Sequence, residues 1–447
     1  MTKASPLSHN QNMSFSLLSV LAGSLASLGC LIRAFYVLRR KRLIDDMPTS
    51  KAQGVFIGQV ELKGTAESDE PLASYLAEVG CVQYTWQVDE HWSRTVIETY
   101  TDAQGHTQTR TRTESGWTRV AGGSQSIPFY LKDDTGVIRI VPEGAAINSV
   151  AVFDETCSPT NALYFGKGPP HGVPNSTHRR RFHETALPLH TALYVMGQAR
   201  ERADIVAPEI AHDKGAPMFL ISTRTERQVS RRYVLSFWLW VLLALGTVIG
   251  GAIGWSMLEK EAFIWQPLVT AAGGFGAALL IGWVWTLYNS LVNLHHMVEQ
   301  GWSQVDVQLK RRHDLIPNLV ETVKGYRGYE SETQKLLAEI RTQTEATPPG
   351  VAGPDFRGVA PMLNIVVERY PELKASDSFL RLQQTLIDTE QRIALARDYF
   401  NNVATFYNTR LAIVPDRFVA AIARLHPQAL MAAADFERAP VHVQLAS

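Results

Sequence analysis

The sequence lacks the features that define several common classes of protein. It carries 43 Lys and Arg against 43 Asp and Glu, and this balance argues against a dedicated nucleic-acid binder, which needs a basic surface to release counterions. Three cysteines are too few for a disulfide-stabilised scaffold, and none stands in a CxxC or Cys/His spacing typical of structural zinc. The sequence leaves open whether Cys81 and Cys157 pair. At 447 residues, the chain is too long for a single core.

A catalytic or metal-binding pattern is also missing. His183-Glu184 is not followed by the histidine that a zinc-binding HExxH helix requires at position i+4, and Pro188 disfavours a helix there. Gly122-Gly123 lies outside any phosphate-binding loop pattern. Arg179, Arg180 and Arg181 would repel a cation bound by the neighbouring histidines, and we interpret them instead as a contact to anionic lipid. We therefore expect no enzyme, no metal and no cofactor.

Three long apolar runs dominate the sequence. We expect an N-terminal tail at 1–12 and transmembrane helices at 13–38, 233–258 and 263–287, because about 20 apolar residues suffice to cross a bilayer. The first run lacks an A-x-A-like cleavage site, and its basic residues follow rather than precede it, which favours a retained anchor over a signal peptide. No charged residue lies deep in these runs, which disfavours a transporter.

Small residues recur every four positions in the second and third runs. Such stripes let helix backbones approach closely in lipid, so we predict packing within this helical hairpin or between subunits. The residues are Gly246, Gly250 and Gly254 in the second run and Gly274, Ala278 and Gly282 in the third.

Basic residues near the run ends predict the orientation. Arg39 to Arg42 follow the first run, and Arg227, Arg231 and Arg232 precede the second. Because Lys and Arg accumulate on the cytoplasmic side, we expect both soluble domains to be cytoplasmic, with the N-terminus and the hairpin turn outside.

Residues 50–230 are predicted to form a β-rich domain, for which a barrel-like arrangement is one option. Alternating Thr and charged residues between Val96 and Val120 predict a long hairpin, interpreted either as a partner or lipid-headgroup surface or as a solvated excursion. Gly80 to Tyr84, Phe129 to Ala145 and Phe182 to Gly197 resemble the GIDE domain, which stands beside the membrane in mitochondrial RING-type ubiquitin ligases and in prokaryotic relatives. Three cysteines cannot build a RING, so the resemblance implies a membrane-proximal module without ubiquitin transfer.

Residues 288–442 are predicted to form an antiparallel α-helical bundle. Apolar positions continue from the third run to Val323, which indicates one helix leaving the membrane. Spacings of three and four from Phe379 to Tyr407 indicate a second helix with a heptad seam.

The bundle region resembles the LemA family, bacterial membrane-anchored helical proteins. The resemblance is carried by Tyr288 to Val292, Asp306 to Val320, Tyr370 to Ala375 and Tyr407-Asn408, and it implies a bacterial inner membrane location. Asp306, Lys310, Asp314 and Asn318 share one helical face. They either form a ligand site or, as we favour, pair with Glu390, Arg392, Arg397 and Asp398 of the second helix.

Together these features describe a multi-domain membrane protein with three transmembrane helices. Its expected role is a non-enzymatic, self-assembling scaffold for membrane or envelope organisation. The alternative is an adaptor or regulator of a membrane protease or another envelope quality-control enzyme. Its expected partners are the lipid bilayer, further copies of the chain and a membrane protein, and not nucleic acid.

Overall fold

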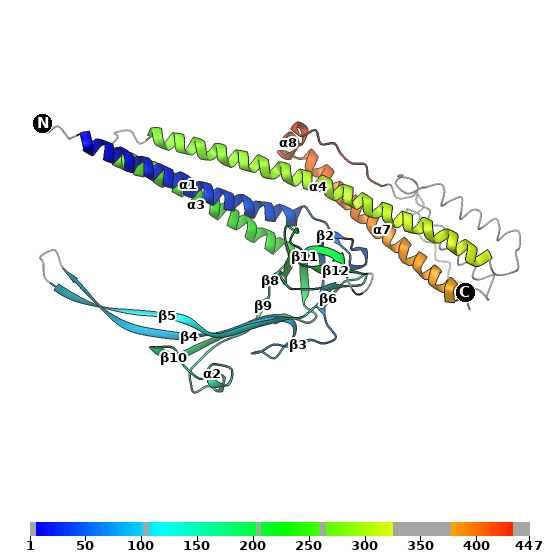
Figure 1. Ribbon diagram of the computed structural model, residues 1–447, viewed down its shortest axis with the longest axis horizontal. Helices are drawn as coiled ribbons and strands as arrows, with labels where there is room; N and C mark the ends of the chain where they lie inside the picture. Colours follow the sequence, from blue (N-terminus) through cyan, green and yellow to red (C-terminus); the bar gives the residue numbers. More distant parts are fainter. Residues whose placement is uncertain are drawn as a thin grey trace, which may run out of the picture. The chain divides into compact units, whose positions relative to one another are not determined.

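The computed structural model describes residues 6–101, 107–202, 204, 207–259, 265–324 and 377–431 (Figure 1). The chain divides into two compact units. Residues 49–226 form a β unit, and residues 1–48 with 227–447 form a helical unit. The β unit therefore lies in the sequence between two helices of the other unit.

Three long apolar helices form the first part of the helical unit. They are α1 (Pro6–Asp45), α3 (Glu226–Glu259) and α4 (Trp265–Lys324). Each contains a segment long and apolar enough to cross a membrane, at Leu18–Asp45, Glu226–Met257 and Leu268–Leu315. The three predicted apolar helices are thus confirmed by length and composition. Residues 260–264, which include most of the predicted hairpin turn, lie outside the described residues.

Helix α4 continues without a break for 60 residues, from its apolar half into a polar half that packs on α7 (Asp377–Ala412). Three contacts fix an antiparallel register. His295 lies 5.5 Å from Tyr407 between ring centroids, Trp302 lies 5.5 Å from Phe400, and Arg312 Nη1 lies 3.7 Å from Glu390 Oε1. Each step forward along α4 is matched by an equal step back along α7.

The later part of the predicted heptad seam is buried in α7, at Leu386, Thr389, Ile393, Ala396, Phe400, Val403 and Tyr407. Leu382 is half-buried, and the side chain of Phe379 lies outside the described residues. A short helix, α8 (Asp416–Ile422), follows α7. The described part of the predicted bundle thus consists of α4, α7 and α8. Residues 325–376 and 432–447 lie outside the described residues.

The β unit contains a closed ring of five strands, which gives it a barrel-like form. The ring runs β2 (Gly58–Glu67), β6 (Phe129–Lys132), β7 (Val137–Ile140), β12 (Pro208–Ala211) and β11 (Ala192–Glu201), and β11 pairs back with β2. Leu62, Leu131, Ile140, Val195 and Ile210 fill its core. The short strands β1 (Thr49–Ser50), β8 (Ala146–Asn148) and β13 (Leu220–Ser222) extend this sheet, and the single turn η1 (Ala52–Gly54) follows β1.

A second sheet carries the predicted long hairpin. Its strands are β3 (Leu72–Ala73), β4 (Gly80–Thr101), β5 (Thr107–Ser126), β9 (Val150–Cys157) and β10 (Ser176–Pro188), and helix α2 (Ala162–Gly166) follows β9. β4 and β5 pair from Gln83↔Ser126 to Thr101↔Thr107 with one register shift between Val88 and Asp89, which confirms the hairpin. Cys81 and Cys157 are both buried and both free, which answers whether they pair.

The two ends of the β unit meet at one lysine. Lys63 Nζ on β2 donates to Thr49 Oγ1 at 2.8 Å and to Glu226 Oε2 at 2.7 Å. Thr49 begins the unit and Glu226 ends it. The Lys63 side chain therefore binds both the first and the last residue of the β unit to strand β2.

Candidate helix-packing and polar sites

Helices α1 and α3 approach each other backbone to backbone. A Cβ placed on Gly23 would lie 2.7 Å from the Thr247 carbonyl oxygen and 3.0 Å from Gly251 Cα. A Cβ on Gly251 would lie 3.1 Å from the Ser19 carbonyl oxygen. Glycine is therefore required at both positions, because any side chain would separate the helices.

The predicted small-residue stripes make different contacts from those expected within a hairpin. A Cβ on Gly254 would lie 3.3 Å from Ser19 Cβ, and one on Gly282 would overlap the Phe35 ring, so both glycines face α1. Nothing lies within 4 Å of a Cβ built on Gly246, Gly250 or Gly274. The close contacts of the hairpin residues thus go to the first helix, while packing between subunits stays a prediction.

Gly23 and Gly251 were missed by sequence reasoning. The spacing of Ser19, Gly23 and Ser27 in the first run is itself a small-residue stripe and could have revealed the contact.

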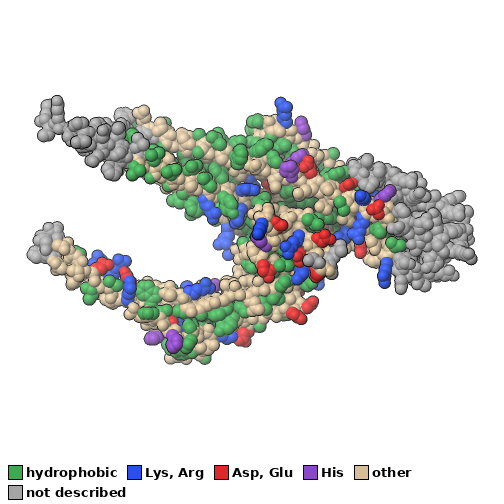
Figure 2. Space-filling model, in the orientation of Figure 1, with side chains coloured by type: hydrophobic (Ala, Val, Ile, Leu, Met, Phe, Trp, Pro, Cys, Tyr) green, Lys and Arg blue, Asp and Glu red, His purple; other side chains and the backbone are tan. Residues whose placement is uncertain are grey.

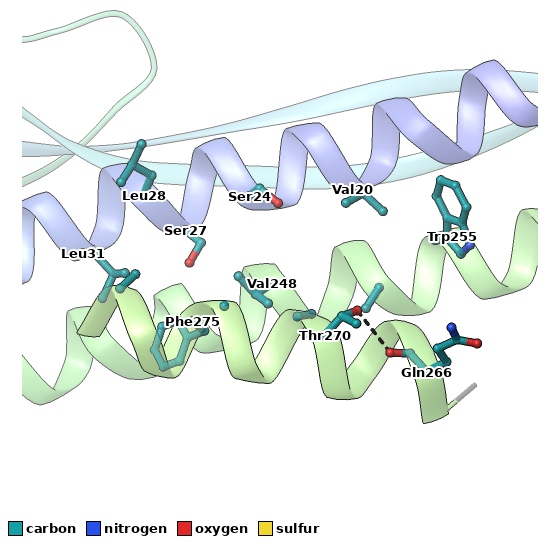
Figure 3. A pocket seen from close by; sticks show the side chains of 14 residues that line it. Val20, Ser24, Ser27, Leu28, Leu31, Val248, Trp255, Gln266, Thr270 and Phe275 are labelled. Carbon is teal, nitrogen blue, oxygen red and sulfur yellow. Dashed lines mark hydrogen bonds between the residues drawn. The ribbon is translucent and has the colours of Figure 1, made fainter. Parts of the chain in front are cut away.

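A cavity of about 770 Å³ separates α4 from α1 and α3 (Figure 3). Leu28, Val248 and Phe275 make its wall largely apolar, and the predicted residues Gly274 and Ala278 line it on α4. The hydroxyls of Ser24 and Ser27 on α1 point toward α4 in Figure 3. Such a lining suits an apolar chain and holds no titratable side chain.

A buried ionic cluster joins the ends of α1, α7 and α8 to the middle of α4. Arg410 on α7 donates through Nη1 to Asp46 Oδ1 and through Nε to Asp416 Oδ2, the first residue of α8. Ser290 on α4 donates to Asp46 Oδ2. Asp46 is 3% exposed, and its burial raises the pKa of this carboxyl even though Arg410 and Ser290 act in the opposite direction. Next to it, Ser230 of α3 donates to Asp45 Oδ1 at 2.7 Å.

Only part of the predicted polar face of α4 lies at the contact between α4 and α7. Asp306 is half-buried, whereas Lys310 and Asp314 are exposed, and the side chain of Asn318 lies outside the described residues. The buried cation is instead Arg312, 4% exposed and paired with Glu390. A polar pair therefore does join α4 to α7, but its α4 residue is Arg312 and not one of the predicted residues.

Two asparagines of α7 hold the chain that follows α8. Asn408 donates through Nδ2 to the Gln428 carbonyl at 2.8 Å and accepts the Gln428 N–H at 2.8 Å. Asn401 makes the same pair of bonds with Met431, at 3.1 and 2.9 Å. Seven residues of helix rise about 10.5 Å and three extended residues span about 10 Å, so the two spacings coincide. This clamp accounts for Asn408 of the LemA-like motif.

The three consecutive arginines do not form one surface. Arg180 is 1% exposed, so the lipid contact predicted for it is wrong. It donates through Nε and Nη2 to Glu90 Oε2, at 3.1 and 3.0 Å, and through the remaining N–H groups to the carbonyls of Tyr164, Pro169 and His171. Arg181 bonds Asp89 and stacks over Trp117, whereas Arg179 is exposed. Alternation along β10 explains this, because its neighbours point to the opposite face.

Glu184 on the same strand is a second buried carboxylate. It is 0% exposed and accepts the backbone N–H groups of Tyr75, Leu76 and Ala77 together with the Ser74 hydroxyl. These bonds hold the turn between β3 and β4, a structural task. Among the described residues, no group of three or more His, Cys, Asp or Glu side chains could hold a metal ion.

Comparison with known proteins gives two matches to family models. Residues 301–445 match the LemA family, and residues 97–254 match the GIDE family, described as E3 ubiquitin ligase.

Individual relatives match about a third of the chain. Protein LemA of Metamycoplasma hominis is 24% identical over 158 residues, 34% of this chain and 72% of the relative. Magnetosome protein MamQ of Magnetospirillum gryphiswaldense is 24% identical over 178 residues, 32% of this chain and 65% of the relative. MamQ 2 of Paramagnetospirillum magneticum is 23% identical over 167 residues, 30% of this chain and 61% of the relative. The chain thus spans less than two thirds of the length of both magnetosome proteins.

Proposed function

Because this chain joins a C-terminal LemA-family region to a GIDE-type region, we propose that it is a membrane-anchored scaffold that self-assembles and organises the membrane in which it lies. The scaffold acts by positioning and not by chemistry.

The observation that carries the proposal is the continuity of α4. The same helix contains an apolar segment of spanning length and the seam with α7, and Arg410 ties α7 to the end of α1. A continuous helix transmits tilt and rotation, so the orientation of the α4–α7 pair follows that of the membrane helices. Self-assembly through either the membrane helices or the α4–α7 pair therefore also fixes the orientation of the other part.

The relatives support a membrane-associated LemA-family protein. One is named a LemA protein and two are named magnetosome proteins, and their matches cover about a third of this chain. The exposed residues Gly246, Gly250 and Gly273 offer small-residue surfaces on α3 and α4 for contacts between copies.

Native mass spectrometry of the full chain released from nanodiscs tests self-assembly. We expect a discrete oligomer, and Gly246→Leu with Gly250→Leu should shift it toward the monomer because both replacements widen the α3 surface. Gly29→Leu is the matched control, since a Cβ there also meets nothing within 4 Å but lies on α1. A monomer at every concentration in wild-type samples contradicts the proposal.

The proposed topology is three-pass in a bacterial inner membrane, with both soluble regions cytoplasmic. The basic residues at the ends of α1 and α3 support it. Val307→Cys on α4 should resist an impermeant thiol reagent in intact cells and react after lysis, since Val307 is 54% exposed. Labelling in intact cells would show that this region of α4 lies outside the cytoplasm, which contradicts the proposed topology.

A second candidate function is an adaptor for a membrane protease or another quality-control enzyme. It is favoured by the β4–β5 hairpin, where β5 pairs only with β4 among the described strands and so leaves one edge for strand addition. Photocrosslinking from Thr111 in β5 should recover a specific membrane enzyme if this function holds, and further copies of the chain alone if it does not.

A further inference from the structure

The turn after α7 and helix α8 expose a compact set of large apolar side chains. Val414 is 67% exposed, Phe418 63% and Ile422 85%, and they recur at four-residue spacing, with Ile413 beside them. On the opposite face of α8, Asp416, Val419 and Ala420 are buried. The short helix is therefore two-sided, with its apolar outer side lacking a covering element in the described chain. We call Ile413, Val414, Phe418 and Ile422 the α8 patch.

The position of the α8 patch follows from the course of two helices. Helix α4 leaves its apolar segment and α7 runs antiparallel to it, so the C-terminal end of α7 returns toward the apolar segments (Figure 1). Residues 413–422 therefore lie at the end of the α4–α7 pair that is nearest to the apolar segments.

The ionic cluster fixes this level more closely. Asp416 at the start of α8 shares Arg410 with Asp46, and Asp46 accepts from Ser290. Ser290 stands three residues beyond the predicted third span, about 4.5 Å at the rise of an α-helix. The headgroup region is about 5–8 Å thick on each side of the hydrocarbon. The predicted end of the third span at 287 thus places the start of α8 level with lipid headgroups.

Charge and shape agree with such a location. Arg417 lies within α8 and Arg424 follows it, and both are exposed beside the apolar side chains. Figure 2 shows basic side chains and hydrophobic ones intermixed over this part of the helical unit. A short element with an apolar outer face and exposed cations matches what binds at the surface of a bilayer containing anionic lipids.

We propose that the α8 patch is a membrane-surface contact that inserts Val414, Phe418 and Ile422 between lipid headgroups. It rests on the membrane-spanning arrangement of the proposed function. The contact gives the α4–α7 pair a second attachment to the bilayer beside α4 itself. Its occupant is lipid, with anionic headgroups at Arg417 and Arg424.

Fluorescence quenching in nanodiscs tests this contact. Single cysteines replace Ile422, Leu242 or Val307 in the full chain and carry a bimane label, with labelled wild type as the background. The nanodiscs contain phosphatidylglycerol and phosphatidylcholine with a mixture of shallow and deep doxyl lipids, so that labels at headgroup level and labels in the middle of the bilayer both meet a quencher. Leu242 is an exposed residue of the α3 apolar segment, and Val307 is an exposed residue of α4 about 25 Å beyond Ser290.

We expect doxyl lipid to quench Ile422→Cys at least about twofold and Val307→Cys negligibly, because doxyl groups act at contact range and the shallow ones lie in the headgroup layer. Arg417→Gln with Arg424→Gln should reduce the quenching at Ile422, and omission of phosphatidylglycerol should have the same effect.

Two results overturn the contact while leaving the proposed function intact. In one, Leu242→Cys is quenched but Ile422→Cys behaves like Val307→Cys and remains open to aqueous iodide. In the other, Ile422→Cys is shielded from both quenchers, which would assign the α8 patch to a second copy. An unquenched Leu242→Cys would overturn the spanning arrangement and the contact together.

Discussion

Arg410 and Asp46 form a buried ion pair across 364 positions of sequence. Asp46 follows the last residue of α1, and Arg410 lies near the end of α7, so the pair joins the apolar helices to the α4–α7 seam. It is one of the contacts that hold the apolar helices and the α4–α7 pair together.

Removing the cation should therefore destabilise the helical unit. Arg410→Gln removes the cation that hydrogen-bonds both Asp46 and Asp416 and leaves Arg42 as their neighbouring cation, a loss of about 3 kcal/mol. Thermal unfolding of the detergent-solubilised chain measures it. The exposed Arg417→Gln is the control and should have little effect. Adding Asp46→Asn to Arg410→Gln should recover part of the loss, and equal stability of all variants would refute the role of the pair.

The close approach of α1 and α3 predicts a disulfide. Ser19→Cys and Gly254→Cys should cross-link on oxidation, because a Cβ on Gly254 lies 3.3 Å from Ser19 Cβ, close to the spacing in disulfides. Gly23→Val should lower the cross-linking yield by separating the helices. Gly29→Val, on the same helix in open space, should leave it unchanged. Equal yields in both backgrounds would mean that Gly23 is not at the crossing.

The asparagine clamp predicts local changes in hydrogen exchange. Asn408→Ala removes two hydrogen bonds to Gln428, worth about 1–3 kcal/mol together. The Gln428 amide should then exchange faster, while the Met431 amide, held by Asn401, is less affected. The neighbouring exposed Asn402→Ala is the control. Unchanged exchange at Gln428 in Asn408→Ala would show that the tail is held by other contacts.

Glu90 predicts an acid-sensitive β unit. Burial raises the pKa of Glu90, but hydrogen bonds from Ser176 and Arg180 outweigh it and leave the pKa below its usual value. A lowered pKa in the folded state adds stability above the unfolded value of about 4.3, and this is lost as the pH falls through the folded value.

Glu90→Gln should therefore lower stability at pH 7 and flatten its decline below about pH 4.3. Calorimetry of the full chain across pH 3–7 measures both effects, and the exposed Glu98→Gln is the control. A Glu90→Gln profile parallel to that of wild type would assign the acid sensitivity to other carboxyls.

Periodicity made the helices and the long hairpin predictable. The heptad spacing around Ile393 and Phe400 and the threonine alternation from Thr107 to Thr113 are local signals. Each specifies a helix or a strand from neighbouring residues alone. Composition likewise located the three apolar helices.

Contacts between distant segments were not predictable. The ring closes through β2 and β11, whose paired residues are 127 to 141 positions apart, and no local pattern specifies that pairing. Arg180 was misplaced because three adjacent arginines carry the same charge, and only the pairing of β10 with β4 shows which one meets Glu90. Asn318 lacks a described side chain, so its predicted role remains a prediction.

Thr49 and Glu226, the two ends of the β unit, both bond to Lys63 and therefore lie close together. A continuous segment whose two ends lie within reach of one side chain can be gained or lost without stretching its host. A short linker from Asp46 to Arg227 should therefore excise the β unit and leave a smaller protein of helices alone.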